Sequence, residues 1–166
     1  GLSKSLDSDV YTVMSYENTH NGEFSYSSYD PETFMILDVI ALQYLYGANT
    51  YKNSGDNTYY LVRDNAYSTI WDPAGTDEIN FKNSQMDWFI SLPWFIWTEN
   101  TPDYTGYAVT YQNGANIIKE FPTDLVWLLG DIENATGGSG DDIIVGNHLD
   151  NKLSGGLGND EIEGWE

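Results

Sequence analysis

The chain has 166 residues, with 26 acidic and 6 basic side chains, so its formal net charge at pH 7 is −20. This charge argues against nucleic acid and anionic membranes as partners, and it opposes compaction unless cations neutralise it. The hydrophobic fraction of 40% and the aromatic fraction of 15% are those of a folded protein, and the absence of cysteine excludes disulfides and thiolate metal sites. No apolar run is long enough to span a membrane. The sequence shows neither a signal peptide nor a starting Met, so we expect a chain excised from a longer protein. As an isolated module we expect it to be a monomer.

The predicted elements begin with a short strand-like run at residues 10–13. The segment DPETFMILDVIALQYLYG predicts one helix, in which Asp30 is a good N-cap, Pro31 fits the first helical position and Gly47 follows the end. Its apolar residues recur at helical spacing, so we expect it to be mostly buried. Residues 50 to 130 are typical of short strands separated by turns, with candidates at 58–62, 68–72, 78–81, 88–92, 94–97, 107–112 and 125–129.

Glycine recurs every nine residues near the C-terminal end, at 137, 146, 155 and 164. Residues 137–145 and 155–163 match the nonapeptide G-G-x-G-x-D-x-U-x of a parallel β-roll at every fixed position, whereas residues 146–154 are degenerate and carry Asn151 in the aspartate position. Successive turns of such a roll face opposite sides, so the first and third repeats would share an ion. Acidic residues among glycines favour a hard cation with oxygen ligands, and calcium is the leading candidate. The predicted ligands are the carbonyls of Gly138, Gly140, Gly155 and Leu157 and the carboxylates of Asp142 and Asp160. A glycine-rich acidic linker is the alternative, and two complete matches in register argue against it.

This repeat resembles those of the repeats-in-toxin (RTX) family of type I secreted proteins. Other motifs follow the order of the serralysin metalloproteases: VMSY at 13–16, TFMILDVIALQYLYGAN at 33–49, GDNTY at 55–59, WDPAGTD at 71–77 and IENA at 132–135. The resemblance covers residues 10 to 81 and 130 to 164. Residues 83 to 127 do not follow the family's pattern and carry most of the tryptophan.

The resemblance implies two further calcium sites. One would use Asn53, Gly55, Asn57, Asp72, Ala74 and Asp77, and the other would use Gly75, Asp77, Asp131 and Glu133. Asp131 replaces the family's threonine and Ala74 replaces a glycine, but a backbone carbonyl survives either change. Carboxylates spaced as Asp72 and Asp77 around a glycine turn are also suitable oxygen ligands in their own right. Turns capped by aspartate are the alternative.

The zinc motif of the serralysins, H-E-x-x-H-x-x-G-x-x-H, is absent, because the only histidines are His20 and His148. Met14 would be the Met-turn residue and Tyr16 the auxiliary tyrosine ligand, and without zinc both are expected to be packing residues. We therefore expect several calcium ions, no zinc and no catalysis by this chain.

Two classes of function remain. The first is a calcium-dependent binding module of an RTX adhesin that recognises a peptide on a cell surface through its terminal carboxylate, or a glycan. Its candidate ligand-binding residues are Tyr16, Trp88, Trp94, Trp97, Tyr104 and Tyr107, although most of these aromatics are expected to fill the core. The second is the C-terminal folding and secretion half of a serralysin-type metalloprotease; a structural spacer is a third option. Either main hypothesis implies export from a Gram-negative bacterium by type I secretion.

The expected fold is mainly β with one N-terminal helix. A Met-turn-like segment and helix (1–50) would precede a sandwich-like β domain with an aromatic-rich insert (51–130). A short calcium-bound parallel β-roll (131–166) would follow, and the three parts would form one compact unit.

Overall fold

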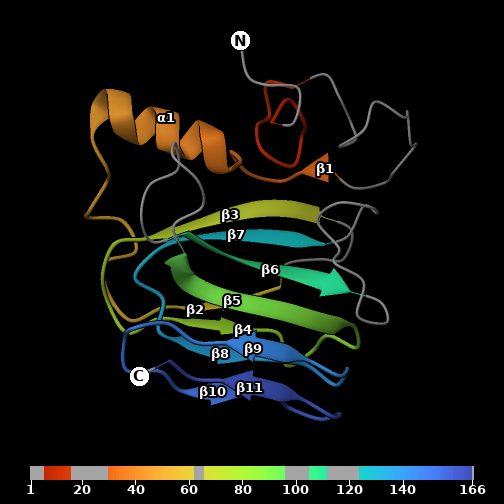
Figure 1. Ribbon diagram of the computed structural model, residues 1–166. Coiled ribbons are helices and arrows are strands. Elements are labelled where there is room, and N and C mark those ends of the chain that lie inside the picture. The colour runs from red at the N-terminus through yellow and green to blue at the C-terminus, as the bar shows by residue number, and fades with distance from the viewer. Residues whose placement is uncertain (1–5, 16–29, 62–65, 96–104, 112–123, 166) are drawn as a thin grey trace.

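The computed structural model describes residues 6–15, 30–61, 66–95, 105–111 and 124–165, which form one α-helix and two β-sheets (Figure 1). The larger sheet has seven strands in the order β1 (Asp30–Pro31), β3 (Ala66–Asp72), β7 (Leu125–Gly130), β6 (Thr105–Tyr111), β5 (Asp87–Phe95), β9 (Ile143–Val145) and β11 (Glu161–Glu163). The smaller sheet has four strands in the order β10 (Leu153–Ser154), β8 (Asn134–Thr136), β4 (Glu78–Asn80) and β2 (Thr58–Tyr60). The predicted mainly β fold with one N-terminal helix, α1 (Ile36–Tyr46), is confirmed.

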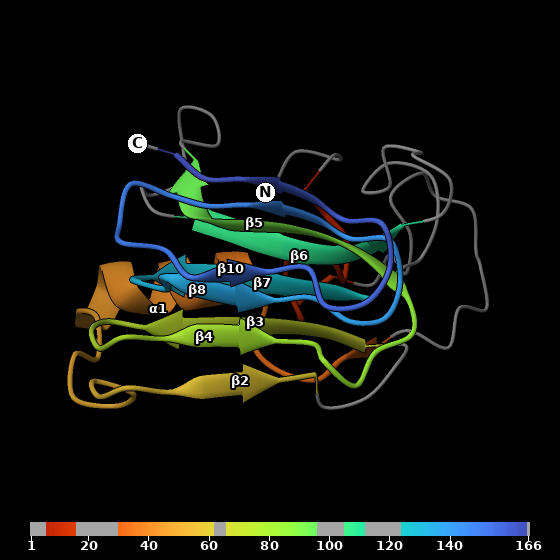
Figure 2. The ribbon, with the colours of Figure 1, turned by 90° about the horizontal axis from the view of Figure 1, so that it is seen from below.

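Consecutive strands alternate between the two sheets from β7 to β11, and the two sheets lie face to face (Figure 2). The pairings among β9, β11 and β5 are parallel, and they align Ile144 with Ile90 on one side and with Ile162 on the other. Only β6 runs antiparallel to its neighbours, β5 and β7. Each nonapeptide therefore supplies one short strand and one turn, and the two complete repeats lie side by side in the same sheet.

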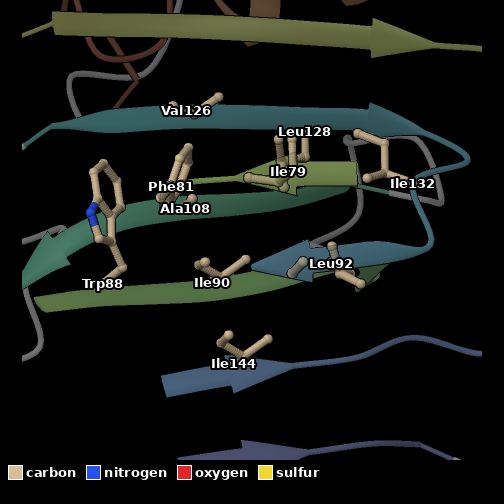
Figure 3. Close-up of a cluster of buried hydrophobic side chains, with 11 residues drawn as sticks. Ile79, Phe81, Trp88, Ile90, Leu92, Ala108, Val126, Leu128, Ile132 and Ile144 are labelled. Atoms are coloured by element: carbon tan, nitrogen blue, oxygen red, sulfur yellow. The ribbon is translucent and has the colours of Figure 1, made fainter. Parts of the chain in front are cut away.

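The space between the sheets is filled by one apolar cluster, which Figure 3 shows with side chains from both sheets pointing toward each other. Its members include Ile79 and Ala135 from the smaller sheet and Trp88, Ile90 and Ile144 from the larger sheet. Trp88 is fully buried, and its indole N–H donates a hydrogen bond to Ser84 Oγ at 2.8 Å. Trp88, one of the candidate ligand-binding residues, therefore lies in the core between the two sheets rather than on the surface.

A second cluster covers the opposite face of the larger sheet. Strand β7 contributes to both clusters by alternation: Trp127 and Leu129 face α1 and the N-terminal segment, whereas Val126 and Leu128 face the smaller sheet. The indole of Trp127 also donates to the carbonyl of Val10 at 2.9 Å. This central strand is buried on both faces, which accounts for its continuous apolar sequence.

The helix begins later than predicted. Asp30 and Pro31 form β1, paired in parallel with β3, and α1 starts at Ile36. The carboxylate of Asp38 accepts hydrogen bonds from Met35 N at 2.9 Å, Val13 N at 2.9 Å and Thr12 Oγ1 at 2.6 Å, so the cap comes from inside the first turn. The predicted helix end at Gly47 is correct, because its N–H donates to Gln43 O at 2.8 Å.

Three further predictions fail locally. The helix is not mostly buried: only its start is enclosed, and the second half exposes Leu42, Tyr44, Leu45 and Tyr46. The run at 10–13 forms turns rather than a strand, with Tyr11 N and Thr12 N both donating to Ser8 O. In the larger sheet, the two strands predicted at 88–92 and 94–97 are one continuous strand, β5.

No helix in the part of the chain that the structure describes is long and apolar enough to cross a membrane.

Candidate metal centre

Two turns that are distant in sequence meet beside the start of β2 and the end of β3. The first contains Asn57 and the second contains Asp72 and Asp77. The main-chain N–H of Asn57 donates to Asp77 Oδ1 at 2.7 Å, and its carboxamide donates to Asp72 Oδ2 at 3.2 Å and to the carbonyl of Gly55. At Gly75, whose φ is +142°, a Cβ would lie 2.6 Å from Gly55 O and 3.0 Å from Asp77 Oδ1. Glycine thus lets these oxygens converge.

The carboxylate of Asp77 is the outstanding feature of this convergence. Asp77 is 0% exposed, and its Oδ2 is buried without any hydrogen-bond partner. The pKa of Asp77 is raised to about 6, first by burial and then by the charges of Asp72 and Glu133, while the N–H of Asn57 opposes the shift. A buried carboxylate oxygen with no donor and anionic neighbours is costly unless a cation meets it. The residues here therefore fit an oxygen-ligated metal ion.

The other predicted members of this first site lie around the same turns. Asn53 has a positive φ of 59°, and its carboxamide donates to Trp71 O at 3.0 Å. Ala74 is exposed, and its N–H donates to Asp72 Oδ1 at 3.2 Å. The structure therefore brings Gly55, Asn57, Asp72 and Asp77 together, while the side chain of Asn53 is turned to the main chain at Trp71.

The second predicted site shares Asp77. Glu133 Oε2 accepts a hydrogen bond from Asp77 N at 2.7 Å, and Glu133 N donates to Asp77 O at 3.3 Å. Asp131 is exposed and is joined to the group through its main chain, since its N–H donates to Asp72 O at 2.9 Å. Glu133 therefore approaches Asp77 with its side chain, and Asp131 keeps its carboxylate toward solvent.

The third predicted site lies between the two complete repeats. Asp142 is buried and its carboxylate accepts from Gly138 N and Trp88 N, each at 2.7 Å. The next carboxylate in the stack, Asp160, accepts from Asp142 N at 2.9 Å. Burial raises the pKa of Asp142, and the charge of Asp160 adds to the shift. The carbonyls of Gly138 and Gly140 face Gly156 and Gly158 of the later repeat, where any Cβ would overlap them, and the Gly138 carbonyl also accepts from Leu157 N at 3.0 Å.

In the degenerate repeat, the side chain of Asn151 makes the hydrogen bonds of the turn in place of an aspartate carboxylate. The Asn151 carboxamide nitrogen donates to Glu133 O at 2.8 Å and to Asn147 Oδ1 at 2.7 Å, and its oxygen accepts from Asn147 N at 2.8 Å. Asn147 is fully buried and donates in turn to Ile132 O at 2.9 Å. Amide N–H groups therefore occupy the centre of this turn, where the complete repeats place carboxylates.

Among the described residues, no group of three or more His, Cys, Asp or Glu side chains is placed to hold a metal ion. Any ion at these turns would need main-chain carbonyl and carboxamide oxygens for much of its shell. Calcium accepts such ligands, and with them takes six to eight oxygens in flexible geometry.

The predicted ligand-binding aromatics are not gathered on one surface. Trp94 stacks on Trp165 with ring centroids 4.2 Å apart, and both are partly exposed. Tyr107 instead packs between Phe89 and Trp127 in the second apolar cluster. Tyr16, Trp97 and Tyr104 lie outside the described residues, as does His20.

Sequence reasoning missed Tyr59, whose hydroxyl donates to Asp72 Oδ2 at 2.5 Å. The two-residue period of a strand could have indicated this contact. Tyr59 follows Asn57 by two residues, and side chains two residues apart share a face of a strand.

No family model matches the chain. Among curated proteins it is 33% identical over 160 residues to a serralysin of Proteus mirabilis, a match that covers 89% of this chain and 29% of that protein. It is 30% identical over 159 residues to the metallopeptidase AprA of Pseudomonas marginalis and 31% identical over 163 residues to serralysin G of Dickeya chrysanthemi, with 89% of this chain covered in each case. The chain is thus homologous to part of the serralysins and spans about 30% of their length. Residues 83 to 127, which we expected to depart from the family, make up more than a quarter of the chain. A match that covers 89% of the chain leaves out only about a tenth of it, so it must include part of that segment.

Proposed function

We propose that this chain is the calcium-dependent folding and secretion region of a serralysin-type metalloprotease. The observation that carries the proposal is the buried, unpartnered oxygen of Asp77 at the meeting point of two glycine turns. The homology to part of the serralysins supports the same assignment.

The residues that would hold calcium fall into two groups. Gly55, Asn57, Asp72 and Asp77 would form one site, and Glu133 would extend it from the neighbouring turn. Asp142 and Asp160, with carbonyls of the glycine-rich repeats, would form another. Bound calcium would supply positive charge at carboxylates that the fold removes from water.

The net charge of −20 would make folding depend on calcium. In the low calcium of the cytosol, repulsion among the acids would keep the chain extended, which suits passage through a type I secretion channel. Outside the cell, millimolar calcium would drive folding, because a ligand that binds only the native state stabilises it. The parallel strands of the repeats would then form a short calcium-bound β-roll at the end of a β-sandwich.

The exposed second half of α1 is consistent with a larger parent protein. Leu45 and Tyr46 are 67% and 81% exposed, and such apolar patches commonly mark protein interfaces. A catalytic half that carries the zinc motif would be a suitable partner for this face.

The test joins this chain to the zinc-bearing part of the Proteus mirabilis serralysin. We expect calcium-dependent secretion through a type I system and calcium-dependent cleavage of casein. The control chimera carries a glutamine in place of the glutamate of the HExxH motif; it should be secreted and folded but inactive. A chimera whose melting temperature and activity are the same in calcium and in excess chelator would contradict the proposal.

A second candidate is the peptide-binding module of an adhesin, and the partly exposed stack of Trp94 on Trp165 favours it. Aromatic rings give large contact area at low entropic cost. A peptide array with free and amidated C-termini, with and without calcium, tests this candidate. Binding that needs both a free carboxylate and calcium would support it; binding only to a glycan array would instead assign a glycan.

A further inference from the structure

One hydrogen bond links the two sheets at the first candidate calcium site. Tyr59 comes from β2 at the edge of the smaller sheet, and Asp72 is the last residue of β3 in the larger sheet. The phenol hydroxyl of Tyr59 donates to Asp72 Oδ2 at 2.5 Å, and Asp72 is 0% exposed. A separation of this size is typical of the strong hydrogen bonds between a hydroxyl and a carboxylate.

The other donors to Asp72 are weaker. Asn57 reaches the same oxygen at 3.2 Å, and Ala74 N reaches Oδ1 at 3.2 Å. Hydrogen bonds at that distance are at the long end of the usual range. The rotation of the Asp72 carboxylate is therefore held chiefly by Tyr59.

A phenol is suited to this task because it is a neutral donor. The ordinary pKa of a tyrosine phenol is about 10, so the hydroxyl keeps its proton at neutral pH. A lysine or arginine in this position would also orient the carboxylate, but its charge would cancel the attraction for a cation. Tyr59 orients Asp72 and leaves its negative charge available.

We propose that Tyr59 is a positioning residue of the cation site: its hydroxyl fixes the Asp72 carboxylate beside Asp77 and thereby sets the affinity for calcium. This inference rests on the proposed function. It assigns to Tyr59 no contact with the ion.

The test compares Tyr59→Phe with Tyr60→Phe, each of which removes one hydroxyl from β2. Tyr60 is a matched control because it is 51% exposed and its ring lies 5.4 Å from the Lys82 ammonium. Calcium affinity is measured on the whole chain by competition with a chromophoric chelator, and the melting temperature is measured in chelator and in saturating calcium. We expect Tyr59→Phe to weaken calcium binding about ten-fold or more, as for the loss of a hydrogen bond to a charged group, and Tyr60→Phe to match the wild type.

The increase in melting temperature caused by calcium distinguishes a positioning role of Tyr59 from a role in packing alone. A packing role would lower both melting temperatures of Tyr59→Phe equally and leave the rise unchanged, which would overturn the inference. Equal affinities of Tyr59→Phe and the wild type would overturn it as well. If the wild-type chain itself bound no calcium, the proposed function would fail together with the inference. Should Tyr59→Phe not fold in chelator, the competition titration, begun from calcium-loaded protein, still measures its affinity.

Discussion

Replacing Asp77 by Asn should change stability in opposite directions with and without calcium. The pKa of Asp77 is raised from 3.8 to about 6, chiefly by burial. At 1.36 kcal/mol per pKa unit, the ionised carboxylate costs the calcium-free fold about 3 kcal/mol at pH 7. Asparagine has the same shape without the charge, and its oxygen can still accept from Asn57 N. The calcium-free variant should therefore be more stable than the wild type by up to about 3 kcal/mol, or roughly 5 to 10 °C in melting temperature.

In saturating calcium the same substitution removes a ligand, so the stabilisation by the ion should shrink. Thermal unfolding followed by circular dichroism, in chelator and in millimolar calcium, measures both effects. The control is Asp150→Asn, which removes one charge from an exposed position in the degenerate repeat. If Asp77→Asn destabilised the chain to the same extent in both buffers, neither the buried charge nor the metal ligand would have the part assigned to it.

Three further predictions concern the fold around the site. In protein stripped of metal, the free energy of unfolding should rise by about 1 kcal/mol as the pH falls from 7 to 5, because the folded chain binds the Asp77 proton more tightly than the unfolded chain. Urea titrations should show a weaker pH dependence in Asp77→Asn. Gly130→Ala should lower the free energy of unfolding in urea by about 3 kcal/mol, since Gly130 has a φ of +94° and a Cβ would overlap the Asp72 carbonyl. The control Gly164→Ala should be neutral, because a Cβ there meets no atom within 4 Å. Trp88→Ala should cost about 3 to 5 kcal/mol as a core truncation; a much smaller loss, accompanied by loss of peptide binding, would restore Trp88 as a ligand contact.

The local pattern of the sequence was sufficient wherever the structure is itself local. Nine-residue spacing predicted short strands separated by glycine turns, and the two complete repeats form β9 and β11, two repeats apart and paired in parallel. Within these turns, Gly156 and Gly158 of the last repeat have positive φ values, which glycine adopts readily. Turn chemistry of this kind depends on a few consecutive residues, so it can be predicted from them.

Burial depended on partners far away in the chain. Trp88 and Trp94 are both aromatic residues of β5, yet Trp88 is enclosed between the sheets and Trp94 is partly exposed. The period of a strand separates odd from even positions, but it cannot say which residues a second sheet covers. The helix shows the same limit. Its apolar pattern predicted burial, but only the start of α1 packs on the larger sheet.

The sequence by itself determined the kinds of group that would meet a cation: carboxylates, carboxamides and the carbonyls of glycine turns. The tertiary structure decided which of them meet. It joins turns 20 residues apart at Asn57 and Asp77, removes Asp77 from water and leaves one of its oxygens without a donor. It also brings the Tyr59 hydroxyl from the other sheet onto Asp72. Desolvation and hydrogen-bond geometry are properties of three-dimensional neighbours, which is why the sequence could supply candidate ligands but not their environment.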